Sequence, residues 1–270
     1  MTEERKPDTA GALEMLKDFQ IETVDYAYRR LYEEDRDRFL IADEVGLGKT
    51  LVARGLIARA IDRLWEGENR IERIDVIYVC SNADIASQNI NRISLDRVGD
   101  SSRRQKTFAS RLTLLPKHLS DLNQNRVNFV SFTPGTSFNL RSSGGIAHER
   151  ALIYWLLRDG WGFGNTAAEK NVFQLGVSTK KKWRDYYLDK AEDEDINQDL
   201  ADRFIRKLEE REDLQDQFDQ LCEDFGYLRT RDAKSEEEKQ RQTSFLGEIR
   251  RVLANTCCEA LEPDLVILDE

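Results

Sequence analysis

The sequence predicts an α/β fold in which a central parallel sheet is interrupted by a mostly helical insertion. Three observations support this prediction. Short apolar runs alternate with stretches of helical apolar spacing in the first half of the chain, which is the order of elements in parallel α/β sheets. A charged stretch follows that is too long to be a plain connection. One more apolar run then closes the sequence.

A glycine-containing turn lies between the first expected strand and helix. Residues 38–42 suit a short buried strand, and apolar residues at helical spacing predict a helix over 51–65. Between them, glycines let the backbone approach phosphate, a lysine supplies a cation and a threonine supplies a hydroxyl for Mg²⁺. A chance match in a loop is the alternative. We therefore expect an ATP site, with Mg²⁺, whose binding residues are Gly46, Leu47, Gly48, Lys49 and Thr50.

Two more strands are predicted before residue 140. Residues 74–80 are apolar and precede a helix-like stretch over 84–95, and residues 127–132 form a third apolar run. The third run leads into a turn made of Thr133, Pro134, Gly135 and Thr136. Because Pro-Gly is common in ordinary turns, this sequence alone is equally compatible with a structural role.

The last apolar run ends on two carboxylates, Asp269 and Glu270. Carboxylate oxygens suit a hard cation such as Mg²⁺. A polar strand end is the alternative reading of this pair. The glycine turn and the terminal Asp-Glu together are more specific than either motif alone.

The run Asp43-Glu44-Val45-Gly46-Leu47-Gly48-Lys49-Thr50 resembles motif I of superfamily 2 helicases, particularly Swi/Snf-type DNA translocases, although Asp43 stands where a first glycine is usual. The resemblance implies a RecA-like P-loop domain and a place for each further motif. Residues 74–95 occupy the position of motif Ia but lack its usual proline and tryptophan. Gln20, which precedes a helix-like stretch over 22–32, occupies the position of the adenine reader, and an ordinary helix-start glutamine is the alternative.

The same resemblance implies roles for the remaining site residues. Lys49, Asp269 and Glu270 are the expected catalytic residues: Lys49 holds phosphate, and Glu270 accepts a proton from the attacking water. Thr50 and Asp269 are the expected Mg²⁺ residues. The turn from Thr133 to Thr136 corresponds to motif Ib, which contacts the phosphate backbone of nucleic acid.

These motifs imply three segments. Residues 1–140 are expected to form the first part of the RecA-like domain, 141–261 a helical charged insertion with two or three amphipathic helices in its second piece, and 262–270 the motif II strand. In this superfamily a second RecA-like domain supplies an arginine to the ATP, and we expect that domain to lie outside this sequence. Without it, the resemblance implies nucleotide binding with hydrolysis near background.

The function implied is that of the ATP-binding lobe of a DEAD/DEAH-type helicase or DNA translocase, which couples ATP hydrolysis to movement on nucleic acid, DNA rather than RNA. Bacterial phage-defence and restriction-associated helicases share this general look, so defence-system proteins are expected partners. The alternative is a nucleotide-gated interaction module that binds ATP and signals to a partner without translocation. An unrelated P-loop ATPase is a third interpretation.

Charge is distributed unevenly along this chain, whose net charge is −10. Residues 1–140 carry 21 Lys and Arg against 22 Asp and Glu, whereas residues 141–270 carry 20 against 29. Residues 92–126 carry eight basic and three acidic side chains, which suits either a phosphate-binding patch or a solvated loop. The run Lys180-Lys181-Lys182-Trp183-Arg184 suits either base stacking or an exposed helix start whose tryptophan packs on the core.

The remaining composition favours a cytoplasmic protein that does not enter a membrane. The four cysteines show no C-x-x-C spacing and only two histidines are present, which makes a zinc site improbable. No apolar leader and no long uncharged apolar stretch occur in the sequence.

Overall fold

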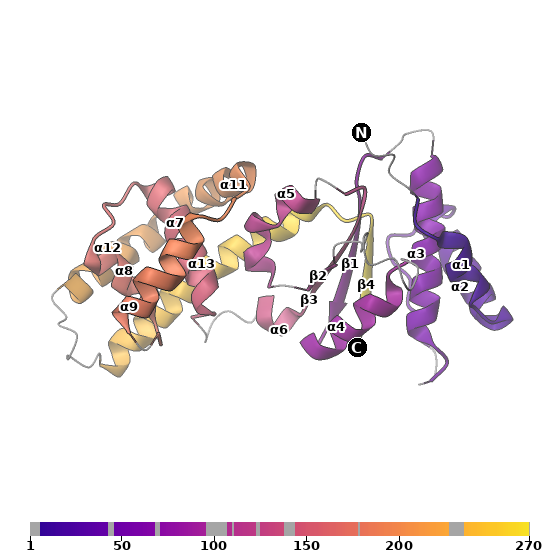
Figure 1. Cartoon of the computed structure of the whole chain (residues 1–270), viewed down its shortest axis with the longest axis horizontal. Helices are drawn as coiled ribbons and strands as arrows, with labels where there is room; N and C mark the ends of the chain where they lie inside the picture. The colour runs from indigo at the N-terminus through magenta and orange to yellow at the C-terminus, as the bar shows by residue number, and fades with distance from the viewer. Residues whose placement is uncertain are drawn as a thin grey trace. The chain divides into compact units, whose positions relative to one another are not determined.

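The computed structural model describes residues 6–42, 46–67, 71–95, 107–109, 111–122, 125–137, 144–177, 179–226 and 235–269. The chain divides into two compact units, whose elements are labelled in Figure 1. The sheet unit contains residues 1–110, 121–133 and 262–270, and the helical unit contains residues 111–120 and 134–261. The chain therefore enters the helical unit briefly at residue 111, returns to the sheet unit for one strand, and re-enters the helical unit at residue 134 rather than at 141.

A parallel sheet is the centre of the first unit. Its strands lie in the order β2-β3-β1-β4, and every pair of neighbours is parallel. The strands are β1 (Ile74–Cys80), β2 (Thr107–Ala109), β3 (Val127–Phe132) and β4 (Leu265–Asp269). This small parallel sheet combined with helices is compatible with the predicted α/β class, and the runs at 74–80 and 127–132 form strands at the predicted residues.

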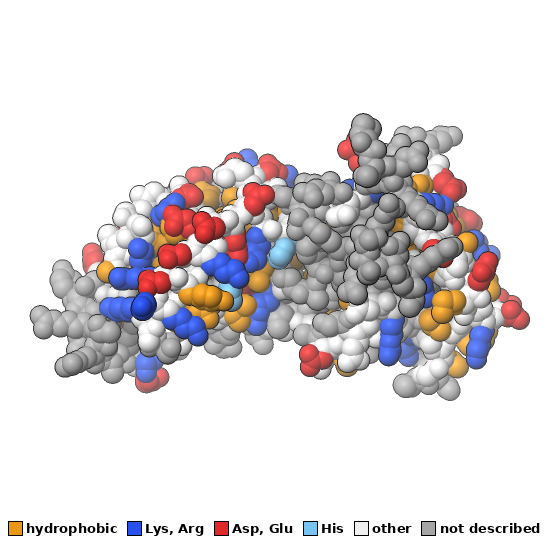
Figure 2. Space-filling view, in the orientation of Figure 1, with side chains coloured by type: hydrophobic (Ala, Val, Ile, Leu, Met, Phe, Trp, Pro, Cys, Tyr) orange, Lys and Arg blue, Asp and Glu red, His pale blue; other side chains and the backbone are white. Residues whose placement is uncertain are grey.

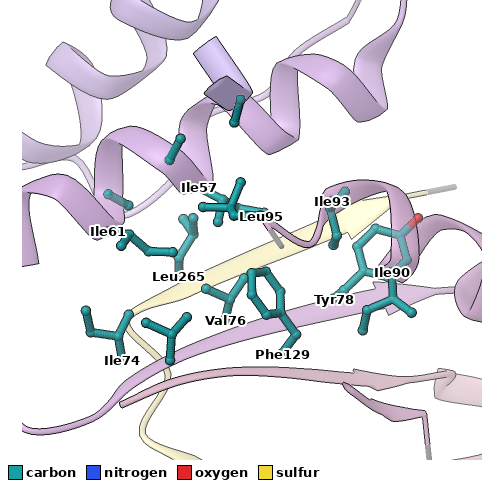
Figure 3. Close-up of a cluster of buried hydrophobic side chains, with 14 of the residues drawn as sticks. Ile57, Ile61, Ile74, Val76, Tyr78, Ile90, Ile93, Leu95, Phe129 and Leu265 are labelled. Atoms are coloured by element: carbon teal, nitrogen blue, oxygen red, sulfur yellow. The ribbon is translucent and has the colours of Figure 1, made fainter. Parts of the chain in front are cut away.

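Two helices cover one face of the sheet and make the unit's main core. Helix α3 (Lys49–Glu66) and helix α4 (Ala83–Ile93) supply Ile57, Ile61, Ile90 and Ile93 to a cluster in which these four side chains are at most 1% exposed (Figure 3). The sheet supplies alternate residues of its strands, which include Ile74, Val76, Tyr78, Phe129 and Leu265. Because side chains alternate between the faces of a strand, this cluster fixes which residues of β1 and β4 point toward the helices.

Two shorter helices pack on the outer side of α3, and the segment after them corrects a prediction. Helices α1 (Thr9–Glu14) and α2 (Asp18–Tyr32) are joined through Leu16, which packs with Val24 of α2 against Val52 of α3. Residues 38–42 are not a strand, and Leu40 is 84% exposed. Only Ile41 of this run packs on the α1–α3 cluster. The apolar run predicts a strand, but no described strand pairs with it. Its amides therefore gain no hydrogen bonds by extending alongside the sheet.

The helical unit contains a helix that is buried nearly all round. In α7 (Ala147–Trp161) every residue from Glu149 to Leu157 is buried, as expected for a helix at the centre of a bundle. The described elements around it include α8 (Ala167–Gln174), α9 (Lys180–Lys182), a π-helix (Trp183–Leu188), α10 (Asp189–Glu192), α11 (Gln198–Glu209), α12 (Glu212–Gly226) and α13 (Glu236–Leu261). Helices α11, α12 and α13 confirm the prediction of amphipathic helices in this stretch.

Two buried charged residues at the start of α7 tie distant parts of the helical unit together. The carboxylate of Glu149 accepts hydrogen bonds from Thr113 Oγ1, from the Ile146 amide at 2.7 Å and from Arg250 at 2.9 Å. Thr113 belongs to the 3₁₀-helix Leu112–Lys117, which explains why residues 111–120 join this unit. The guanidinium of Arg150 donates to five backbone carbonyls between residues 144 and 175. Burial lowers the pKa of Arg150 to about 10.

Two short helices occur where the chain passes between the units. They are α5 (Leu119–Leu122) and α6 (Pro134–Ser137). Across the described part of the chain, the helices are too short or too polar to cross a bilayer.

Candidate nucleotide site

The glycine turn before α3 has the backbone geometry that its sequence suggests. Gly46 has φ +94° and Gly48 has φ +81°, a region that side chains with a Cβ rarely adopt. Gly48 directly precedes α3, which begins at Lys49 and runs for 18 residues. The positive end of the helix dipole and the Lys49 side chain therefore lie at the same point of the chain. Such a helix start can hold an anion such as phosphate.

Gln20 contacts this turn from α2. Its Oε1 accepts a hydrogen bond from the Lys17 amide at 3.0 Å, and its Nε2 donates to the carbonyl of Leu47 at 2.9 Å. The side chain is only 4% exposed, and a Cβ placed on Gly48 would lie 2.6 Å from Nε2. Helix α2 begins before Gln20, earlier than predicted, and the bond to the Lys17 amide is the one expected of a helix-start glutamine, which was the alternative interpretation. The position of Gln20 makes it a brace for the glycine turn.

The strand ends bring several other predicted residues to one edge of the sheet. Cys80 is opposite Asp269, and Val79 is opposite Phe132, so β1, β3 and β4 end side by side. Asn82 follows β1 and caps α4, accepting from the amides of Asp84 and Ile85 at 2.8 and 3.2 Å. Ligands of parallel α/β sheets bind at this carboxyl edge. The edge therefore brings Asn82, Thr133 and Asp269 together in the sheet unit.

Asp269 is held by two polar side chains that sequence reasoning missed. Its Oδ2 accepts a hydrogen bond from the hydroxyl of Tyr78 and another from Asn89 Nδ2 at 3.3 Å. Asn89 also donates to the Tyr78 hydroxyl at 3.0 Å. Burial, together with the bond to Asp269, raises the pKa of Tyr78. The hydroxyl therefore stays protonated and keeps donating at physiological pH.

The other oxygen of this carboxylate, Oδ1, is open as far as the described residues go. No described residue donates a hydrogen bond to Asp269 Oδ1, and Asp269 as a whole is half-buried. An anchored carboxylate with one open oxygen suits a water in the hydration shell of Mg²⁺. No group of three or more His, Cys, Asp or Glu side chains gathers as a metal site in the described part of the chain. One carboxylate and a threonine would still suffice for Mg²⁺, which keeps most of its waters and uses phosphate oxygens.

The turn predicted to touch nucleic acid divides at the boundary of the two units. Thr133 belongs to the sheet unit and is 5% exposed, whereas Pro134, Gly135 and Thr136 start α6 in the helical unit. Pro134 and Gly135 are exposed. The backbone of this turn is thus continuous with the carboxyl edge of β3.

The basic stretch 92–126 is corrected in part by the structure. Arg126 is 6% exposed, donates to the carbonyls of Ile71 and Trp65, and stacks on the Trp65 ring at 3.7 Å. Arg111 pairs with Glu149 and Lys117 with Glu194 inside the helical unit. Counting charges along the chain could not reveal these partners. Residues 96–106 of the stretch lie outside the described residues.

Some of the predicted site also lies outside the described residues. These parts are Asp43, Glu44 and Val45, the side chain of Thr136, and Glu270. Tyr78 and Asn89 left one signal in the sequence: a tyrosine inside an apolar strand needs a partner for its hydroxyl. The partner itself could not be named without the register of β1 and β4.

Comparison with known proteins adds no relative to this description. No protein-family model matches the chain, and neither a curated protein nor a solved structure matches it. The functional argument therefore rests on the residues themselves.

Proposed function

We propose that this chain is the ATP-binding lobe of a superfamily 2 helicase or DNA translocase, with a RecA-like sheet unit and a helical insertion. The observation that carries the proposal is the glycine turn: two glycines with positive φ lead directly into Lys49 and Thr50 at the start of a long helix. This arrangement supplies backbone amides, a cation and a hydroxyl at one point, which is what a nucleotide triphosphate with Mg²⁺ requires.

Three further features of the sheet unit support the proposal. Asp269 ends β4 with one anchored and one open oxygen, as a residue that positions a Mg²⁺-bound water should. Gln20 donates a hydrogen bond to the turn, so the residue proposed to recognise adenine would also support the phosphate-binding backbone. Thr133 follows β3 at the same carboxyl edge, where a nucleic-acid strand could contact the turn that begins there.

In the proposed mechanism a bound Mg²⁺ would supply charge compensation for the triphosphate. Lys49 would bind the phosphates and Thr50 would offer its hydroxyl to the metal. Asp269 would orient a water with Oδ1, while Tyr78 and Asn89 hold its Oδ2. Glu270 would accept the proton of the attacking water. Coupling to movement requires a second RecA-like domain, which supplies the arginine that stabilises the transferring phosphoryl group.

The first test measures ATP binding by the 270-residue chain with titration calorimetry, once in Mg²⁺ and once in EDTA. Lys49→Ala should weaken ATP binding roughly 10- to 100-fold, the range expected when a hydrogen bond to a charged group is lost. Lys239→Ala removes a surface lysine that pairs with Glu236 in the helical unit and should leave the affinity unchanged. Equal ATP affinity for the Lys49 variant and the wild type would contradict the proposal.

A second test separates phosphate binding from the Mg²⁺ role of Asp269. Asp269→Asn keeps the size of the side chain but removes its charge, so ATP binding in EDTA should be unchanged while the strengthening by Mg²⁺ disappears. Gln20→Ala with ATP and GTP then distinguishes the two roles of Gln20. Loss of adenine preference supports base reading, whereas equal weakening of both nucleotides identifies Gln20 as a brace of the turn only.

A further inference from the structure

The segment that follows α8 presents a rigid backbone in the helical unit. Helix α9, the π-helix and α10 are continuous from Lys180 to Glu192, and Thr179 Oγ1 accepts from the Lys182 amide at 3.0 Å to cap their start. Trp183 is fully buried and its Nε1 donates to the Lys170 carbonyl at 2.9 Å. Trp155 Nε1 donates to the carbonyl of Leu188 at 2.8 Å. Two indole N–H groups therefore hold the π-helix at its first and last residues.

The burial of Trp183 decides between the two interpretations of the basic run 180–184. This tryptophan packs on the core and is not available to a base. The π-helix that it begins carries two tyrosines further on, and Tyr186 is 50% exposed. The rings of Tyr186 and Tyr187 meet edge to face at 5.0 Å, and His148 of α7 lies 4.9 Å from Tyr187. π-helical turns are rare and often occur at functional sites.

The charge of this segment differs from that of the unit around it. Residues 180–190 carry five lysines and arginines against two aspartates in the acidic half of the chain. Lys180, Lys181, Lys182, Arg184 and Lys190 form no ion pair with a residue that the structure describes. Figure 2 shows blue side chains gathered over the α9 end of the helical unit.

Most other cations of the helical unit are paired. Among the described residues, ten other lysines and arginines of this unit contact a carboxylate, such as Lys117 with Glu194 at 2.7 Å and Arg241 with Asp224 at 2.8 Å. A cleft of about 770 Å³ next to this segment is more acidic: five carboxylates line it, among them Glu192 and Asp199, against two arginines, Arg158 and Arg206. A polyanion would therefore favour the unpaired cations of residues 180–190 over the more acidic lining of the cleft.

We propose that residues 180–190 together with His148 form a nucleic-acid contact surface, the basic-aromatic face. Its lysines and Arg184 bind the phosphate backbone, and the exposed ring of Tyr186 stacks on a base of a single strand. Base stacking on aromatic rings and cations along the backbone are the two elements of sequence-independent single-strand binding. This inference rests on the proposed function, because it adds a second contact to a nucleic-acid translocase.

The test is fluorescence anisotropy of the full 270-residue chain with a labelled oligothymidylate of about 20 nucleotides and with a duplex of equal length, both over a series of salt concentrations. Lys181→Gln with Lys182→Gln should reduce the slope of log K against log salt for the single strand by about 1.4, since each phosphate contact contributes about 0.7. The matched control is Lys239→Gln with Arg241→Gln, which removes the same charge from paired residues of the same unit.

Tyr186→Ala tests the aromatic part of the face. It should weaken single-strand binding about 10-fold and duplex binding much less, because a paired base is not free to stack. Tyr186→Phe keeps the ring and should restore single-strand binding. Recovery with phenylalanine separates stacking from a structural role of the hydroxyl, and circular dichroism confirms that each variant is folded.

The outcomes separate this inference from the proposed function. If the wild type binds neither oligonucleotide, the nucleic-acid part of the proposed function fails and the basic-aromatic face fails with it. If the wild type binds but the Lys181/Lys182 variant keeps the slope of the control, the face is wrong while the proposed function stands. Binding of labelled polyglutamate as tight as that of the oligothymidylate would also overturn the inference, because the face would then favour acidic protein.

Discussion

The sheet unit and the helical unit each contain a carboxylate that is held by hydrogen bonds, but the two differ in which oxygens accept them. In the helical unit, Glu149 is fully buried and both of its oxygens accept hydrogen bonds, from Thr113 and Arg250 on one side and from Ile146 on the other. In the sheet unit, all of the hydrogen bonds described for Asp269 reach Oδ2. A carboxylate whose bonding capacity is filled holds a fold, whereas one with an open oxygen at a strand end is available for a ligand.

The largest expected effect comes from removing the Glu149 carboxylate, whose two oxygens both accept hydrogen bonds. Glu149→Ala leaves Arg250, which is 1% exposed, without its buried carboxylate, and should lower the free energy of unfolding by about 3–5 kcal/mol in urea denaturation. Glu248→Ala is the matched control, since Glu248 pairs with Arg251 nearer the surface and should cost about 1 kcal/mol or less. If both variants lost the same free energy of unfolding, burial would not explain how much Glu149 contributes to stability.

The glycine turn gives the next largest effect and sharpens the comparison on the ligand side. Gly48→Ala imposes a Cβ at φ +81° and 2.6 Å from Gln20 Nε2, so we expect a cost of about 1–2 kcal/mol and loss of the Gln20–Leu47 hydrogen bond. ATP binding should also weaken, by about 10-fold if moving the turn costs about 1.4 kcal/mol of binding free energy. Gly164→Ala is the control, because its nearest neighbour is 3.8 Å away and its φ is not positive. Unchanged ATP binding in Gly48→Ala would remove the turn from the site.

A smaller effect is expected from removing one of the hydrogen bonds that hold the Asp269 carboxylate. Tyr78→Phe removes one of the two donors to Asp269 Oδ2 and should cost about 1 kcal/mol of unfolding free energy. The strengthening of ATP binding by Mg²⁺ should decrease by a few-fold, because Asp269 is then held by Asn89 alone. Tyr32→Phe, a half-buried tyrosine of the same unit, should change neither quantity. If Tyr78→Phe alters stability but not the Mg²⁺ effect, Tyr78 supports the core and not the site.

The smallest effect is a pH dependence of the sheet unit. Burial raises the pKa of Asp75 even though Asn128 and Arg73 donate to it and oppose the shift, and the neighbouring Asp264 carboxyl raises it further. A carboxyl with a raised pKa in the folded state contributes stability below its unfolded value, near 4, and loses it as the pH rises through the folded value. Asp75→Asn should therefore flatten this part of the stability profile, measured as urea midpoints from pH 3.5 to 7. A slope identical to that of the wild type would exclude Asp75 as its source.

Regular elements were accessible to sequence reasoning where periodicity is long or a run is strongly apolar. The strands at 74–80 and 127–132 and the helix after the glycine turn follow from this local information. Residues 38–42 show its limit, because a short apolar run becomes a strand only when a neighbouring strand completes its hydrogen bonds. Whether such a neighbour exists is a property of the whole sheet.

The candidate site was accessible in its motifs but not in its supports. Gly48 and Lys49 stand out because few other residues suit their tasks. Tyr78 and Asn89 support Asp269 across a separation of 180 or more residues, so only the parallel register of β1 and β4 brings them together. Arg126 and Lys117 looked like part of a basic patch, and their partners are likewise distant in sequence.

The pairing of β1 with β4 has a consequence for synthesis. The Asp264 amide donates to the Asp75 carbonyl, and the Asp75 amide donates to the Asp264 carboxylate, although nearly the whole helical unit separates them in the chain. At roughly 5–20 residues per second, a ribosome needs on the order of ten seconds to make residues 134–261. During that interval the edge of β1 that later receives β4 has no strand on it. Early folding of the helical unit would bring residues 134 and 261 closer together than a random coil of that length, and so would shorten the search by which β4 finds its place.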